Sequence, residues 1–204
     1  MQIPTAHLKA ALLFAAKKDV RYYLNAVLIE WDIDNVSIVA TDGHRLFAAT
    51  HPVNETVEPG SVIVNYEDVK RALTGYKAET IEFTPNADHL LQTATLGSVS
   101  FLPSDGTYPD WRRVVPAKIS GEAAQFDPRY VGDLAKAAKA FGIKDAQAHI
   151  HHNGMDAALV TFGSREDCYA ILMPRRSNET DQHALNVASA VSRPMGSGIT
   201  SQAA

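Results

Sequence analysis

Residues 39–47 read Val-Ala-Thr-Asp-Gly-His-Arg-Leu-Phe, and this stretch predicts a tight bend next to a β-strand. Apolar residues alternate with polar ones over 36–39, which is typical of a half-buried strand. Gly43 permits a positive φ, and Thr41 and Asp42 are expected to form local hydrogen bonds around it. Taken alone, the stretch is also compatible with a plain strand and turn that have no further role.

Further strand signals surround this bend, and three helix signals lie among them. The strands are expected at 27–31, 36–39, 81–83 and 159–162, with turns at Asp34-Asn35, Pro85-Asn86, Asp105-Gly106 and Asn153-Gly154. The helix-like segments are 5–21, 65–77 and 128–144, and a short strand signal precedes each of them. Such helices lying on one face of antiparallel sheets predict an α+β fold.

The three helices recur at a nearly constant spacing, which predicts a repeated unit. Leu8, Val69 and Val131 occupy matching points, 61 and 62 residues apart. Apolar residues at steps of three and four mark the face expected to be buried in each helix. They are Leu8, Ala11, Leu12 and Ala15; Val69, Ala72, Leu73 and Tyr76; and Val131, Leu134, Ala135 and Ala138.

Charge is distributed unevenly over the chain. Its net charge is −4, yet the three helix-like segments hold eleven basic residues against four acidic ones. A basic helical layer on an acidic body suits contact with DNA phosphates. Ordinary solvated helix faces remain the plain alternative.

Bulk properties indicate a globular protein. The 204 residues are 46% apolar, and no run of them reaches the eighteen or so apolar residues of a membrane span. The N-terminus lacks the basic-then-apolar order of a signal peptide, so a cytoplasmic protein with no membrane partner is expected. Cys168 is expected to be a small buried residue on a strand, in a reducing compartment.

Four separated segments resemble the bacterial sliding clamp, the beta subunit of DNA polymerase III. They are 39–47; Tyr108–Pro116, Tyr-Pro-Asp-Trp-Arg-Arg-Val-Val-Pro; Asp19–Asn25, Asp-Val-Arg-Tyr-Tyr-Leu-Asn; and Met173–Arg176, Met-Pro-Arg-Arg. The likeness covers roughly residues 1–176. In that family, these stretches line a pocket that receives short peptide motifs from polymerases and other replication proteins.

The resemblance implies a shortened clamp. A clamp subunit has six units of this kind, and three are expected here: a complete domain over 1–116, and a third unit with the C-terminal pocket segment over 117–176. Residues 177–204 are polar and small, and are expected to form a disordered tail. Because the third unit lacks its partner, it should expose a strand edge and an apolar flank, so a homo-oligomer is expected.

The resemblance also assigns a peptide pocket. Its residues map onto Leu24, Thr41, Gly43, His44, Arg45, Leu46, Pro109, Arg113, Val114, Met173, Pro174, Arg175 and Arg176. The apolar members can accept a Leu or Phe anchor, and the guanidinium groups of Arg45, Arg113 and Arg176 can offer hydrogen bonds at the rim. Arg175 stands where the family has an apolar residue, which implies a more polar C-terminal wall.

The implied function is that of a replication processivity factor. Lys9, Lys17, Lys70, Arg71, Lys136 and Lys139 would contact duplex DNA without reading bases, and a DNA polymerase or another protein with a clamp-binding motif would occupy the pocket. Loading would belong to a separate clamp loader. The alternative is a truncated peptide-binding module or decoy that does not encircle DNA.

An enzyme is the weaker reading. His149 and His151 would share one face of a strand and could begin a metal site, but no third ligand is evident beside them and His152. His44 beside Asp42 is accompanied by no nucleophile motif, phosphate loop or dinucleotide fingerprint. No catalytic residue, metal or cofactor is therefore expected.

Overall fold

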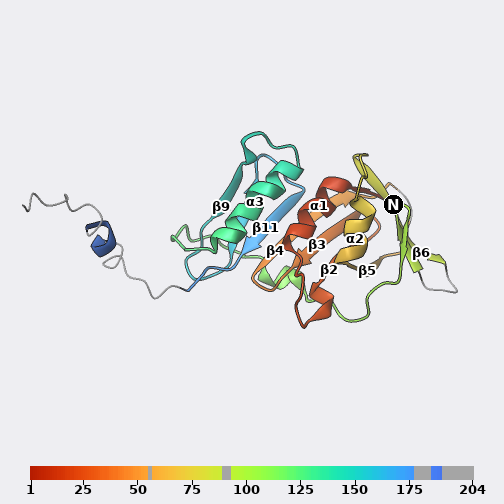
Figure 1. The fold of residues 1–204 in the computed structure, drawn as a ribbon, viewed down its shortest axis with the longest axis horizontal. Coiled ribbons are helices and arrows are strands. Elements are labelled where there is room, and N and C mark those ends of the chain that lie inside the picture. Colours follow the sequence, from red (N-terminus) through yellow and green to blue (C-terminus); the bar gives the residue numbers. More distant parts are fainter. Residues whose placement is uncertain (55–56, 89–92, 177–184, 190–204) are drawn as a thin grey trace, which may run out of the picture.

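The chain folds into helices that pack on antiparallel sheets (Figure 1). The structure is a computed structural model, and it describes residues 1–54, 57–88, 93–176 and 185–189. The α+β class expected from the sequence is confirmed. The helices are α1 (Thr5–Phe14), α2 (Tyr66–Leu73) and α3 (Pro128–Ala140), with short 3₁₀ turns η1 (Tyr22–Leu24), η2 (Trp111–Val114) and η3 (Lys144–Ala146). The strands are β1 (Gln2–Pro4), β2 (Ala26–Trp31), β3 (Asn35–Thr41), β4 (Arg45–Pro52), β5 (Gly60–Asn65), β6 (Thr80–Asp88), β7 (Thr93–Leu96), β8 (Val99–Phe101), β9 (Ala148–His151), β10 (Ala158–Phe162) and β11 (Cys168–Leu172).

Two antiparallel sheets carry the fold. A seven-stranded sheet has the order β5-β2-β3-β4-β11-β10-β9, and a four-stranded sheet has the order β1-β6-β7-β8. The long sheet is continuous because β4 pairs with β11, which places Leu46 opposite Ile171. A strand from the first part of the chain therefore lies beside the last described strand.

The three helices cover one face of the sheets (Figure 1). α1 lies between α2 and α3 and packs on both of them and on the sheet. It is therefore buried on several sides, including His7, Leu8 and Phe14. The two flanking helices each bury a narrower stripe, and side chains at their N-caps close the first turn: Asn65 accepts from the Glu67 N–H, and Asp127 from the Arg129 N–H.

All three helices are present but shorter than expected. α1 ends at Phe14 because the chain turns back, with the Ala16 N–H bonded to the Leu24 carbonyl at 3.0 Å. α3 ends before Gly142, whose φ of 70° closes the helix. Lys17, Lys18 and Lys144 thus lie beyond these two helices, whereas Lys136 and Lys139 remain within α3.

The buried face of α3 differs from the expected one. Leu134 and Ala138 are buried as expected, but Val131 is 40% exposed and Ala135 is also exposed. Apolar residues at steps of three and four form two overlapping stripes on α3, and the fold buries the stripe that includes Ala137. In addition, residues 117–127, all of which are described, contain no strand, so the prediction of a short strand just before α3 is wrong.

The outer face of the long sheet is also covered. A second apolar cluster there includes Leu28, Val39, Leu46 and Ile171, and Tyr108 and Trp111 pack against it. β2 is consequently buried on both faces over most of its length, where half-burial was expected. The segment before and within η2 therefore acts as a third layer.

The expected unit boundaries at 116 and 176 stay predictions. Most of the expected C-terminal tail, 177–184 and 190–204, lies outside the described residues, while 185–189 are helical. Cys168 is buried on β11, as expected. Within the described part of the chain, every helix is too short or too polar to cross a bilayer.

Candidate peptide-binding pocket

The bend between β3 and β4 is held by its own side chains. Gly43 has a φ of 90°, and its N–H donates to the Thr41 hydroxyl at 3.0 Å. The Asp42 carboxylate accepts from the backbone N–H groups of His44, at 2.9 Å, and Arg45, at 3.1 Å. The expected positive φ and local hydrogen bonds are thus confirmed, and local contacts alone hold the shape of the bend.

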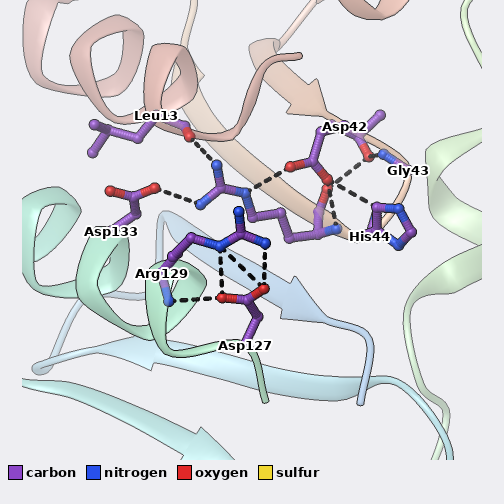
Figure 2. Close-up of polar contacts among 9 residues, drawn as sticks. Leu13, Asp42, Gly43, His44, Asp127, Arg129 and Asp133 are labelled. Carbon is purple, nitrogen blue, oxygen red and sulfur yellow. Dashed lines mark hydrogen bonds and ion pairs between the residues drawn. The ribbon is translucent and has the colours of Figure 1, made fainter. Parts of the chain in front are cut away.

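Arg45 follows this bend, and its guanidinium bonds to three parts of the fold through Asp42, Asp133 and Leu13, which are labelled in Figure 2. Its guanidinium donates to Asp42 at 2.9 Å, to Asp133 on α3 at 2.7 Å and to the Leu13 carbonyl near the end of α1 at 2.7 Å. It also lies 4.4 Å from the centre of the Tyr130 ring.

These contacts change the expected role of Arg45. Its side chain is only 9% exposed, so its donors are used inside the protein and are not offered at a pocket rim. Burial acts to raise the pKa of the Asp133 carboxyl, but hydrogen bonds from Lys136 and Arg45 outweigh it and keep that pKa below its usual value. Arg45 therefore ties the bend to α1 and α3.

A compact apolar cavity of about 190 Å³ lies beside the bend. The cavity is lined by nine residues of the expected pocket: Leu24, Thr41, Gly43, His44, Arg45, Leu46, Pro109, Val114 and Met173. Four further lining residues were missed by the sequence reasoning: Arg21, Asp110, Trp111 and Ile171. The cavity thus collects side chains from segments that are far apart along the chain.

The β4–β11 pairing assembles this cavity. Leu46 and Ile171 lie opposite each other in the sheet, and the Met173 N–H donates to the His44 carbonyl at 2.9 Å. Met173 thereby closes the cavity from the C-terminal side, although its side chain remains 42% exposed. Among the missed residues, Ile171 belonged to an apolar run without a distinctive motif, and its place became evident only from the strand pairing.

The opposite wall is η2 with the residues before it. The Trp111 indole N–H donates to Glu30 on β2 at 3.3 Å, and Arg112 pairs with the same carboxylate at 3.0 Å. Arg112 also lies 4.2 Å from the Trp111 ring centre. The Tyr108 side chain packs against the outer apolar cluster, and its burial raises the pKa of its hydroxyl. This wall is held by packing and by polar contacts to the sheet.

Four expected pocket residues do not line the cavity: Arg113, Pro174, Arg175 and Arg176. Arg113 lines a neighbouring open groove of about 750 Å³, which shares Val114 and Met173 with the cavity. The Arg175 N–H donates to the Gln125 carbonyl at 2.7 Å, and its side chain is exposed. The cavity and the open groove adjoin each other at Val114 and Met173.

The cationic side chains expected to meet DNA are all exposed and come from the helix face. They are Lys9, Lys17, Lys70, Arg71, Lys136 and Lys139. Three of them are paired with carboxylates of their own helix, Lys70 with Glu67, Arg71 with Asp68, and Lys136 with Asp133. Within the described ranges, no carboxylate forms an ion pair with Lys9, Lys17 or Lys139.

The histidines singled out in the sequence, His149, His151 and His44, all take part in local contacts. His149 and His151 share the exposed face of β9, and the His151 Nε2 lies 2.9 Å from the Thr161 hydroxyl. No group of three or more His, Cys, Asp or Glu suited to a metal occurs in the described part of the chain. The His44 ring stacks against Tyr130, and Asp42 bonds the His44 backbone.

Comparisons with known proteins all lead to one family. The family model described as DNA polymerase III beta subunit, central domain, matches residues 5–110. The beta sliding clamp of Escherichia coli K12 is 33% identical over 119 residues, which span 53% of this chain and 30% of that protein. The beta sliding clamp of Proteus mirabilis is 36% identical over 106 residues, or 50% of this chain and 28% of that protein.

Solved structures extend the likeness of fold. The DNA polymerase III beta subunit of Thermotoga maritima has a TM-score of 0.70 at 16% identity, and the match covers 87% of this chain and 65% of that one. The sliding clamp of Pseudomonas aeruginosa bound to griselimycin has a TM-score of 0.62 at 18% identity, covering 87% and 65%. The match to the curated Escherichia coli K12 relative spans under a third of that protein, 30% of its length.

Proposed function

The chain belongs to the DNA polymerase III beta subunit family, and on that premise we propose that it is a clamp-like replication factor that captures peptide motifs of a DNA polymerase. The cavity of about 190 Å³ carries this proposal. This volume is below the roughly 300 Å³ at the lower end of small-molecule pockets. A cavity of this size suits one or two apolar side chains. Capture of this kind requires no catalytic residue.

The peptide contacts follow from the shape of the surface. A Leu or Phe side chain inserts between Leu46, Val114 and Met173, where it loses contact with water. The rest of the peptide follows the open groove past Val114 and Met173 towards Ala157. The exposed Arg113 lines this groove and can bind carbonyls or acidic residues of the peptide.

A titration tests the pocket. A labelled peptide with a Leu-Phe anchor is titrated against the wild type, Met173→Ala and Val114→Ala, with Ile33→Ala as a control. All three variants remove an exposed apolar side chain, but Ile33 lies outside the cavity. We expect each pocket variant to weaken binding about tenfold, a loss of ~1.4 kcal/mol. Equal affinities of all four proteins would contradict the proposal.

The exposed cations of the helix face support non-specific contact with duplex DNA. Lys9 and Lys139 lie on different helices of the same face (Figure 1), so one duplex can meet both. Phosphate contacts of this kind give dissociation constants of about 10⁻⁴ to 10⁻⁶ M that weaken steeply with salt. Such weak contact suits sliding, and the pocket would hold the polymerase at high effective concentration beside its template.

The family further supports a homo-oligomer, a separate loader and a cytoplasmic role in replication. A second candidate function is a peptide-binding module or decoy that never encircles DNA. One observation favours it: every wall of the cavity comes from a single chain, so peptide capture needs no ring. Electron microscopy of the protein with duplex DNA distinguishes the two, because only the clamp function requires a closed assembly around the duplex.

A further inference from the structure

A short helical turn follows the last residue that lines the peptide cavity. Residues 185–189, Leu-Asn-Val-Ala-Ser, form this C-terminal turn, which is dark blue in Figure 1. All five residues are exposed, and the two large apolar side chains among them, Leu185 and Val187, are 63% and 50% exposed. The C-terminal turn therefore presents two apolar side chains to water.

The helical form of the C-terminal turn is easily lost. Isolated helices shorter than about 12–15 residues are marginal in water, and this one has five residues. In a helix, Leu185 and Val187 point in different directions, because residues two apart do not share a face. In an extended chain, residues two apart lie on the same side. Unwinding the turn thus places both apolar side chains on one side of a peptide.

The cavity and the groove beside it fit such a peptide. The cavity of about 190 Å³ is lined by Leu46, Val114 and Met173, and it suits one or two apolar side chains. Val114 and Met173 also line the adjoining groove, together with Ala157. A Leu side chain in the cavity therefore leaves an apolar path in the groove for a Val two residues later.

The chain leaves the fold beside this cavity. The Arg175 N–H donates to the Gln125 carbonyl at 2.7 Å, which holds the chain two residues past Met173. Arg176 is three residues past Met173, so the two lie at most about 11 Å apart. Leu185 is nine residues past Arg176, and such a length can span about 30 Å. The C-terminal turn can therefore reach the cavity of its own chain.

Charge favours the same contact. The chain between the fold and the C-terminal turn contains Glu179 and Asp181 and no lysine or arginine. The groove beside the cavity is lined by Arg113 and Lys118, both exposed, against one carboxylate, that of Asp156. Opposite charges on a segment and on the surface that it approaches attract each other. The segment before the turn is thus drawn towards the groove.

We propose that Leu185 occupies the peptide cavity of its own chain, with Val187 beside it in the groove. The inference rests on the proposed function, because it uses the same cavity. A short tether gives an effective concentration on the order of 1 mM. A turn that alone binds with a dissociation constant of about 0.1 mM then fills the cavity in about nine chains of ten, and it weakens the binding of other peptides about tenfold. A partner must displace it to bind.

A competition titration with the full-length protein tests the occupant. A labelled peptide with a Leu-Phe anchor is titrated against the wild type, the double variant Leu185→Ser/Val187→Ser and the control Ile199→Ser. The control removes an apolar side chain fourteen residues past Leu185 in the same part of the chain. We expect the double variant to bind the peptide about tenfold more tightly than the wild type, and the control to equal the wild type. Equal affinities of all three, or the same gain in the control, would overturn the proposal.

Disulfide trapping tests the position of Leu185. On mild oxidation of dilute protein, Val114→Cys/Leu185→Cys should form a disulfide within one chain, and excess peptide should slow it. Ile33→Cys/Leu185→Cys is the matched control, because Ile33 is also exposed but lies outside the cavity. Native Cys168 is buried, and burial raises the pKa of its thiol to about 12, so it stays unreactive. Equal rates for both pairs, or disulfides that form only between chains, would contradict the proposal.

Failure of this proposal differs from failure of the proposed function. If the cavity binds peptides but the C-terminal turn does not fill it, Met173→Ala weakens the labelled peptide and Leu185→Ser/Val187→Ser leaves its affinity unchanged. If the cavity binds no peptide, neither change alters the titration, and both proposals are overturned.

Discussion

Replacing Arg45 with alanine should destabilise the whole fold. The side chain is 9% exposed, and its loss leaves the carboxylates of Asp42 and Asp133 and the carbonyl of Leu13 without their shared donor. Removing one partner of a buried ion pair costs about 3–5 kcal/mol. The two carboxylates keep 16% and 19% exposure and can regain water, so we expect the lower end, about 3 kcal/mol.

The loss should appear as a lower denaturant midpoint and a Tm lower by about 6–12 °C. Arg45→Lys should lose about half as much, because a lysine keeps the charge but cannot reach three acceptors with one planar group. Arg129→Ala is the matched control: its side chain is 83% exposed and pairs with Asp127 in the same region (Figure 2). If Arg45→Ala and Arg129→Ala unfold at the same denaturant concentration, Arg45 does not join the units.

Three other predictions concern pH, the bend and DNA. Burial lowers the pKa of His7 below 6.5 despite its bond to Asp167, so the unfolded chain takes up a proton at a higher pH than the folded one. The free energy of unfolding should therefore fall as pH drops below about 6.5. Denaturation of the wild type and of His7→Phe from about pH 7.5 to 5 should show this fall only in the wild type. Gly43→Ala forces a side chain into a φ of 90°, which should cost about 1–3 kcal/mol and weaken peptide binding in the same titration. The double variant Lys9→Ala/Lys139→Ala should reduce the slope of log K against log salt for duplex DNA by about 2, and an unchanged slope would contradict the phosphate contacts.

The bend could be predicted because its determinants are local. Thr41, Asp42 and Gly43 bond or shape the backbone within a few residues, so their pattern fixes the geometry before any tertiary contact forms. Strand alternation likewise placed β3 and β10. These parts of the fold depend on periodicity and turn chemistry, which a single sequence displays.

The remaining features depend on what lies across the fold. The direction of the Arg45 guanidinium is set by Asp133, which lies eighty-eight residues away along the chain. Trp111 and Ile171 reach the cavity through packing on the outer face of the sheet. The buried stripe of α3 could not be chosen from spacing alone, because Val131 fits one apolar series and Ala137 fits another. Most residues that line the cavity were predicted from the resemblance to the family, because local sequence patterns could not identify them.

The pairing of β4 with β11 also orders events during synthesis. The ribosome delivers the bend and Leu46 more than a hundred residues before β11 and Met173. Until then the cavity lacks the side formed by Ile171 and Met173, so a nascent chain that stops before β11 has no complete cavity. A peptide that needs all the walls of the cavity can therefore bind only after β11 and Met173 have joined the bend.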